Sequence, residues 1–139
     1  MEKEKIVVDA SVVVKWFLLE EYSDKAELLR NDYVKGLFEI AVPSLLEYEV
    51  LNALKYSGVY TTNELVEIGN AINNYGFLTY ELKDNYKKLT IEIAENSGLT
   101  IYDAAYVALA KHLGTKLYTA DNEIIKKFPR VAIHIKRYQ

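Results

Sequence analysis

The sequence of 139 residues contains no cysteine, which excludes disulfides, zinc-thiolate sites and thiol nucleophiles from its fold and chemistry. Its two histidines, His112 and His134, have no serine or acidic partner in a local motif. No apolar run is long enough for a signal sequence or a membrane span. We therefore predict a soluble cytoplasmic protein without membrane contact, whose chemistry relies on oxygen atoms.

Proline and glycine are also scarce, with two and six copies, and no stretch rich in them divides the chain. About half of the residues are apolar (50%), so a chain of this length can bury one substantial core. We predict a single domain that spans residues 1–139.

The chain lacks the excess of positive charge that is typical of proteins that mainly bind phosphate, because its net charge is −3. The distribution is uneven, however. The basic residues after Asp103 are Lys111, Lys116, Lys126, Lys127, Arg130, Lys136 and Arg137, against only Asp121 and Glu123. This quarter of the chain forms either a basic face or an ordinary solvated surface.

Short apolar or β-branched runs alternate with stretches of helical periodicity. The predicted strands are residues 6–8, 40–42, 77–79, 117–119 and 131–133. The predicted helices are residues 23–35, 44–57, 62–75, 83–97, 101–113 and 122–128, most of them closed by glycine. This alternation predicts an α/β fold with a mainly parallel sheet, in which ligands bind at the carboxyl ends of the strands.

Two aspartates directly follow predicted strands. Asp9 comes after the first strand, with Ser11 two residues later, and Asp121 comes after the fourth, with Thr119 two residues before it. Each aspartate has two interpretations, a ligand at the end of a strand or the cap of the next helix. The local sequence does not choose between them.

The remaining acidic candidates lie on helices. Asp103 is in the first turn of an apolar helix, where a bound cation would offset the cost of desolvating a carboxylate, although Thr100 and Asp103 also have the spacing of a capping box. Glu47 and Glu49 fall on opposite flanks of one helix, so periodicity does not choose between them as a site residue. Each is also explained as an ordinary surface glutamate.

Four segments, taken in order, resemble the signature of PIN domains: Val7-Val8-Asp9-Ala10-Ser11, Glu49-Val50-Leu51-Asn52, Thr100-Ile101-Tyr102-Asp103 and Tyr118-Thr119-Ala120-Asp121. The resemblance covers almost the whole chain and is strongest to the toxin subunits of VapBC-type toxin-antitoxin pairs. It implies a three-layer α/β/α sandwich and identifies Glu49, rather than Glu47, as the family glutamate.

The resemblance also implies a metal-dependent endoribonuclease that uses Mg²⁺ or Mn²⁺. Its catalytic residues and metal ligands would be Asp9, Glu49, Asp103 and Asp121. Ser11, Asn52 and Thr119 would orient these ligands or touch phosphate. Lys15 lies one turn beyond Ser11 if that segment is helical, so it is interpreted either as a contact to the phosphate of the RNA substrate or as an ordinary exposed lysine. Oxygen ligands suit such hard cations, and clustered carboxylates repel one another until a cation binds. The family further implies a homodimer and a small antitoxin protein as partners.

Two other interpretations account for parts of this pattern. A catalytically inactive PIN-fold module that binds RNA or a partner would explain the fold, but it has no physical need for mutually repelling carboxylates. A phosphatase that forms an aspartyl-phosphate needs a second aspartate two residues after the first, and here that position is Ser11.

Overall fold

The computed structural model describes residues 3–139, which form an α/β fold around one five-stranded sheet. The strands are β1 (Lys5–Val8), β2 (Glu39–Pro43), β3 (Leu78–Tyr80), β4 (Leu117–Thr119) and β5 (Ala132–His134). Their order is β3-β2-β1-β4-β5, and every neighbouring pair is parallel. The predicted parallel sheet is confirmed, and each strand lies within two residues of its predicted position.

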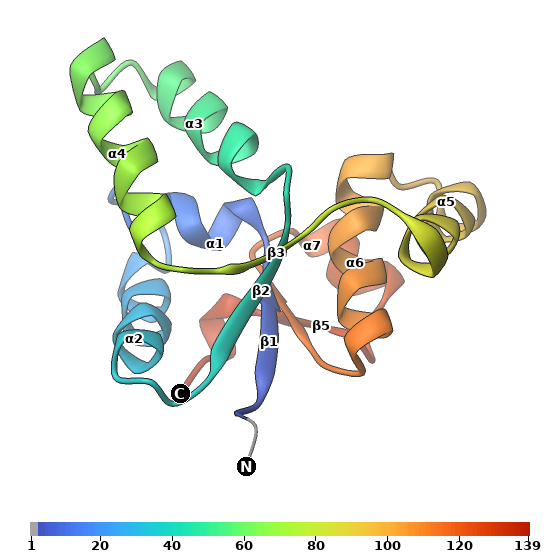
Figure 1. Cartoon of the computed structure of the whole chain (residues 1–139). Coiled ribbons are helices and arrows are strands. Elements are labelled where there is room, and N and C mark those ends of the chain that lie inside the picture. Colours follow the sequence, from blue (N-terminus) through green and yellow to red (C-terminus); the bar gives the residue numbers. More distant parts are fainter. Residues whose placement is uncertain (1–2) are drawn as a thin grey trace.

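Within the described residues the helices are α1 (Ala10–Val14), α2 (Ser23–Val34), α3 (Leu46–Ser57), α4 (Thr62–Asn74), α5 (Asp84–Ser97), α6 (Ile101–Leu113), α7 (Asn122–Lys127) and the 3-10 helix η1 (Ile135–Arg137). Helices α1 and α2 lie on one side of the sheet and α5 and α6 on the other, while α3 and α4 form a hairpin that projects from it (Figure 1). This is the predicted three-layer arrangement. Nowhere in residues 3–139 is there a helix with the length and apolar character needed to cross a membrane.

Helix α6 is the most deeply buried helix of the sandwich. Its residues from Ala104 to Ala110 are all buried, because α6 packs against β1, β2 and β4 and is covered by α5. The apolar character of this segment on all sides is therefore explained by contacts on all sides. Its first turn, which carries Asp103, emerges from this core toward the carboxyl ends of the strands.

The parallel register brings the ends of distant strands to one edge of the sheet. β1 ends at Val8, which pairs with Tyr118 of β4, and the next amide, that of Asp9, donates to the carbonyl oxygen of Tyr118 at 3.2 Å. The residues that follow β1 and β4 are therefore neighbours in space although they are more than a hundred positions apart in sequence. The loops after these strands form the edge at which parallel sheets bind ligands.

An aromatic cluster of Trp16, Tyr33, Tyr75 and Phe77 joins the end of α4 to the helices beneath it. The rings of Tyr75 and Phe77 stack at 5.8 Å between centroids, and Trp16 lies 5.1 Å from Tyr75. The Tyr33 hydroxyl donates to the carbonyl oxygen of Tyr75 at 2.6 Å, and the Trp16 indole donates to that of Ala26 at 2.9 Å. The cluster fixes where Phe77 and the end of α4 lie.

We expect Thr61→Ala to destabilise the fold through α4. Thr61 Oγ1 accepts from the amide of Glu64 at 3.2 Å, while the Thr61 amide donates to the Glu64 carboxylate at 2.8 Å, which makes a complete capping box. Loss of this cap should lower the free energy of unfolding by about 1 kcal/mol, measured by urea denaturation. Thr62→Ala, one residue later and outside the cap, is the control, and an equal loss in both variants would contradict the assignment.

Candidate active site

Asp9 is the buried centre of the acidic edge. Its side chain is only 5% exposed and caps α1 by accepting from the Ser11 amide at 3.1 Å. The same oxygen accepts from the Ser11 hydroxyl, and the second oxygen accepts from the Thr119 hydroxyl. Both carboxylate oxygens are therefore held in place by the loops that follow β1 and β4.

The hydroxyls of Ser11 and Thr119 connect Asp9 to the segment that carries Asp121. Ser11 Oγ accepts from the amide of Ala120 at 3.0 Å, and Thr119 Oγ1 accepts from the amide of Asp121 at 2.9 Å. Asp121 in turn caps α7, because its Oδ1 accepts from the amide of Glu123 at 2.9 Å. Both aspartates thus cap helices and also face a common edge, so the two interpretations of each are compatible.

Glu49 and Asp103 approach from two helices at the rim of this edge. Glu49 Oε1 accepts from the hydroxyl of Tyr106 at 2.6 Å, and Tyr106 lies three residues after Asp103 on α6. The Asp103 amide donates to Thr100 Oγ1 at 3.1 Å, so Thr100 caps α6 as expected. Unlike Asp9, both carboxylates are only half-buried.

The four carboxylates act on one another electrostatically. The pKa of Asp9 is raised from 3.8 to about 6, mainly by burial. Its hydroxyl donors act in the lowering direction, and the nearby charge of Asp121 contributes to the rise. Burial and then the charge of Asp121 raise the pKa of Asp103. Burial also raises the pKa of Glu49. The hydrogen bond from Tyr106 opposes this rise, and the charge of Asp103 adds to it. The structure therefore brings together the four acidic residues that the sequence singled out.

The donor set fits a hard divalent cation. It consists of carboxylate and hydroxyl oxygens, and its mutual repulsion is relieved by positive charge. In the part of the chain that the structure describes, however, no three Asp, Glu, His or Cys side chains already form a group that could hold a metal ion. Asp9, Asp121 and Glu49 each accept hydrogen bonds from protein donors, and each carboxylate keeps further lone pairs that a cation could use.

The other predicted site residues differ in their surroundings. Asn52 is exposed on α3, one turn after Glu49. Lys15 is 8% exposed, and its ammonium group donates to Glu20 at 3.0 Å. Its charge is therefore already paired with a carboxylate of the same chain.

Sequence reasoning did not single out Tyr106 or Glu123 as members of the site. Tyr106 is buried and orients Glu49, and burial raises the pKa of its hydroxyl, so it stays protonated as a donor. The charge of Glu123 also acts on Asp103. The polar partner of Tyr106 is 57 residues away, which no local pattern reveals, whereas Glu123 could have been found from its place in the first turn after Asp121.

Several cations of the C-terminal quarter are engaged within the protein. Lys127 pairs with Glu123 at 3.1 Å and donates to the Ser97 carbonyl oxygen, and Lys116 donates to that of Arg130. Lys111 lies over the ring of Phe128. These contacts give Lys111, Lys116 and Lys127 structural partners within the protein.

Comparison with known proteins gives a consistent result. The sequence model of the PIN domain family matches residues 6–132. The chain is 34% identical to Ribonuclease VapC3 of Pyrobaculum aerophilum over 135 residues, which cover 90% of this chain and 95% of that protein. It is similar to the crystal structure of PAE2754 from Pyrobaculum aerophilum, with a TM-score of 0.65, 26% identity and coverage of 98% and 93% of the two chains. A toxin-antitoxin complex from Klebsiella pneumoniae has a TM-score of 0.69 over 94% of this chain and 97% of that one, but at 13% identity this likeness concerns the fold alone.

We expect Asp9→Asn to stabilise the metal-free protein near neutral pH. The folded pKa of Asp9 is about 6 and its ordinary value is 3.8, so folding is penalised above pH 6, and the penalty disappears as pH falls below about 4. Asparagine caps helices equally well, so near pH 7 in EDTA the gain in unfolding free energy should reach about 3 kcal/mol.

This prediction is checked by urea denaturation near pH 7 and below pH 4. Asp24→Asn changes an exposed aspartate in the first turn of α2; it should lower stability near pH 7 by at most about 1 kcal/mol through the helix dipole and should have no effect below pH 4. If Asp9→Asn instead lowers the metal-free stability near pH 7, burial of an unfavourable charge is not the dominant property of Asp9.

Proposed function

This chain belongs to the PIN domain family, and from that premise we propose that it is a metal-dependent endoribonuclease that hydrolyses RNA phosphodiester bonds. The observation that carries the proposal is the grouping of Asp9, Asp121, Asp103 and Glu49 at the carboxyl edge of the sheet. Each of three pKa values is raised by burial and by a neighbouring acid of the same group. Perturbed carboxylates that converge at such an edge are typical of a functional site.

The chain's own residues supply orientation and charge. Ser11 and Thr119 hold both oxygens of Asp9, and Tyr106 holds one oxygen of Glu49, so each carboxylate is aimed before substrate arrives. The cluster is negative and by itself repels a phosphate group. It can therefore act on RNA only when that charge is compensated.

A divalent cation, Mg²⁺ or Mn²⁺, is the proposed means of compensation. Asp9 and Asp121 would be its main ligands, with Glu49 and Asp103 as further ligands directly or through water, while Ser11, Thr119 and Asn52 orient them or touch phosphate. When bound, such a cation lowers the pKa of the attacking water and stabilises the charge of the transition state. Repulsion between the carboxylates contributes to their raised pKa values. A bound cation would relieve this repulsion, and that relief would contribute to metal affinity.

The biological role that we propose is the toxin of a toxin-antitoxin pair. A relative that is 34% identical is a VapC ribonuclease, and structurally similar chains come from toxin-antitoxin complexes. An antitoxin protein would then be the physiological partner. A homodimer and a cytoplasmic location are proposed with it, on the basis of the family.

RNA cleavage is the direct test of this function. The wild type should cut a mixed structured RNA with Mn²⁺ or Mg²⁺ and stop cutting in EDTA, because the acidic cluster cannot approach phosphate without a cation. Asp9→Asn and Asp121→Asn should each lower the rate by about a hundredfold or more, as expected for loss of a principal metal ligand.

The control for this assay is Asp24→Asn, which removes an equal charge from an exposed position and should cut at the wild-type rate. Equal rates in all variants would reveal a contaminating nuclease. A folded wild type that binds RNA or a partner but never cuts it would favour the inactive module.

Tyr106→Phe should weaken cleavage and change its pH dependence. The hydroxyl of Tyr106 opposes the rise in the pKa of Glu49, so its removal raises that pKa further. Glu49 would then ionise at higher pH, so the acidic limb of the rate profile should move upward and the loss of rate should be largest at the acidic end of the profile.

Tyr86→Phe is the matched control, because Tyr86 is also a buried tyrosine but donates to a backbone oxygen, that of Ala105, at 2.9 Å. It should lose stability without a shift of the pH profile. An unchanged profile in Tyr106→Phe would mean that this hydroxyl does not tune Glu49.

A further inference from the structure

Glu47 carries a polar atom that the acidic site does not account for. Among the described residues, Glu47 Oε1 is a buried side-chain oxygen without a hydrogen-bond partner. None of the ion pairs found in residues 3–139 involves it. Buried polar atoms are nearly always hydrogen-bonded, while the Glu47 residue as a whole is half-buried. This oxygen is therefore free to accept a hydrogen bond from a ligand.

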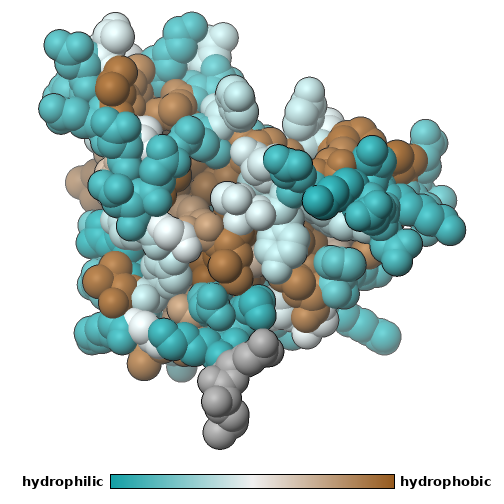
Figure 2. All heavy atoms as spheres, in the orientation of Figure 1, coloured by the Kyte–Doolittle hydropathy of each residue, from teal (hydrophilic) through white to brown (hydrophobic). Residues whose placement is uncertain are grey.

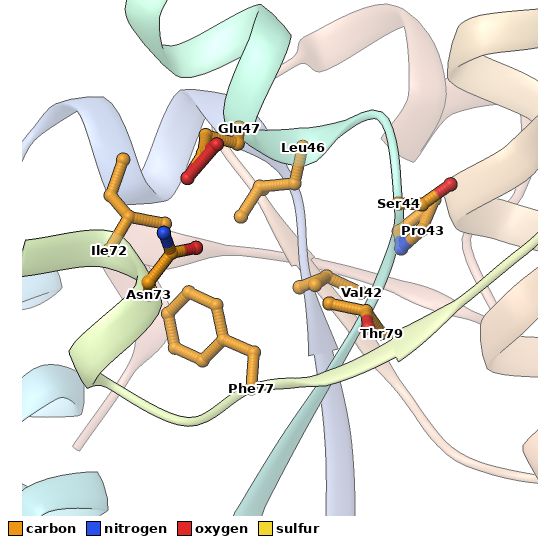
Figure 3. Close-up of a pocket in the computed structure, with 9 residues that line it drawn as sticks. All are labelled: Val42, Pro43, Ser44, Leu46, Glu47, Ile72, Asn73, Phe77 and Thr79. Carbon is orange, nitrogen blue, oxygen red and sulfur yellow. The ribbon is translucent and has the colours of Figure 1, made fainter. Parts of the chain in front are cut away.

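The carboxylate of Glu47 points into a pocket separate from the acidic site. Glu47 and Glu49 are two residues apart on α3, which places them on opposite flanks of the helix. The pocket lies between α3, the end of α4 and β3, and has a volume of about 360 Å³. In Figure 3 the carboxylate of Glu47 lies above Asn73, with Ile72 beside it and the ring of Phe77 below.

The walls of this pocket combine one negative acceptor with apolar and aromatic surface. Leu46, Ile72 and Phe77 supply the apolar part, and Asn73 supplies an amide at the rim. The Phe77 ring is held in place by its stacking on Tyr75. A ligand that fits must bring hydrogen-bond donors and positive charge to Glu47 and tolerate contact with an aromatic face.

We propose that this pocket receives the arginine side chain of a partner protein. A guanidinium group offers paired donors to a carboxylate, packs on aromatic rings, and is less strongly hydrated than the ammonium group of lysine. Its methylene stem suits the apolar walls. The proposal stands on the pocket alone and does not depend on RNA cleavage.

A nucleobase is the competing occupant, and charge disfavours it. Guanine also presents two adjacent donors, but it is neutral and does not compensate the charge of Glu47. The RNA backbone would add negative charge beside a carboxylate on a chain whose net charge is already −3. Tyr48, which follows Glu47 in the sequence, is 80% exposed. Figure 2 shows hydrophobic residues in the middle of the face. A protein partner would therefore have further surface to cover.

The test is an NMR titration of the isotope-labelled full chain with N-acetyl-arginine amide. Saturable shifts are expected at the side-chain amide of Asn73 and at the backbone of residues 72–79. N-acetyl-citrulline amide has the same shape without the charge, and it should bind about tenfold more weakly because a charge-assisted pair is lost. Glu47→Gln should weaken arginine binding by a similar factor.

Glu67→Gln, which changes an exposed glutamate of α4, should bind arginine amide like the wild type. Thermal unfolding verifies that each variant is folded, and the comparison of arginine with citrulline on the wild type needs no variant. Absence of shifts, equal binding of the two ligands or unchanged binding by Glu47→Gln would overturn the proposal. Shifts at the same residues with guanosine monophosphate, lost in Glu47→Gln, would also overturn it and assign the pocket to a nucleobase.

Discussion

The hydrogen bonds that hold the Asp9 carboxylate between two parallel strands are the constraint on which the rest of the site depends. Asp9 follows the central strand β1, and its partners Ser11 and Thr119 belong to the loops after β1 and β4. Desolvation makes this charge unfavourable, and the donors offset only part of that cost, as the pKa of about 6 indicates. The same imperfect compensation would favour a cation at this edge.

Local signals in the sequence accounted for most of the fold. Short β-branched runs and glycine-closed periodic stretches predicted the five strands and six of the helices, because each signal acts within a few residues. The short helices α1 and η1 were not assigned, since segments of three to five residues carry little periodicity. Which strands are neighbours depends on long-range packing, and the local signals predicted only that the sheet is mainly parallel.

The site was partly predictable for the same reason. Asp9 and Asp121 were found because strand ends are visible in sequence, but capping and ligation looked like alternatives, whereas the structure allows both. Periodicity placed Glu47 and Glu49 on opposite flanks of α3 without saying what each flank met. The structure gives Glu49 the hydroxyl of Tyr106 and leaves Glu47 facing a pocket, so one helix divides the acidic edge from a separate surface.

The hydrogen bond from the Thr119 hydroxyl to the Asp9 carboxylate joins residues that are 110 positions apart in the sequence. During synthesis the first half of the acidic edge therefore emerges long before its second half, and β1 cannot acquire β4 as a neighbour until residue 119 has left the ribosome. A protein interrupted before residue 119 lacks both the donor that holds Asp9 and the aspartate that faces it. A polypeptide that ends before residue 119 therefore cannot assemble the acidic edge, whatever the state of its first strands.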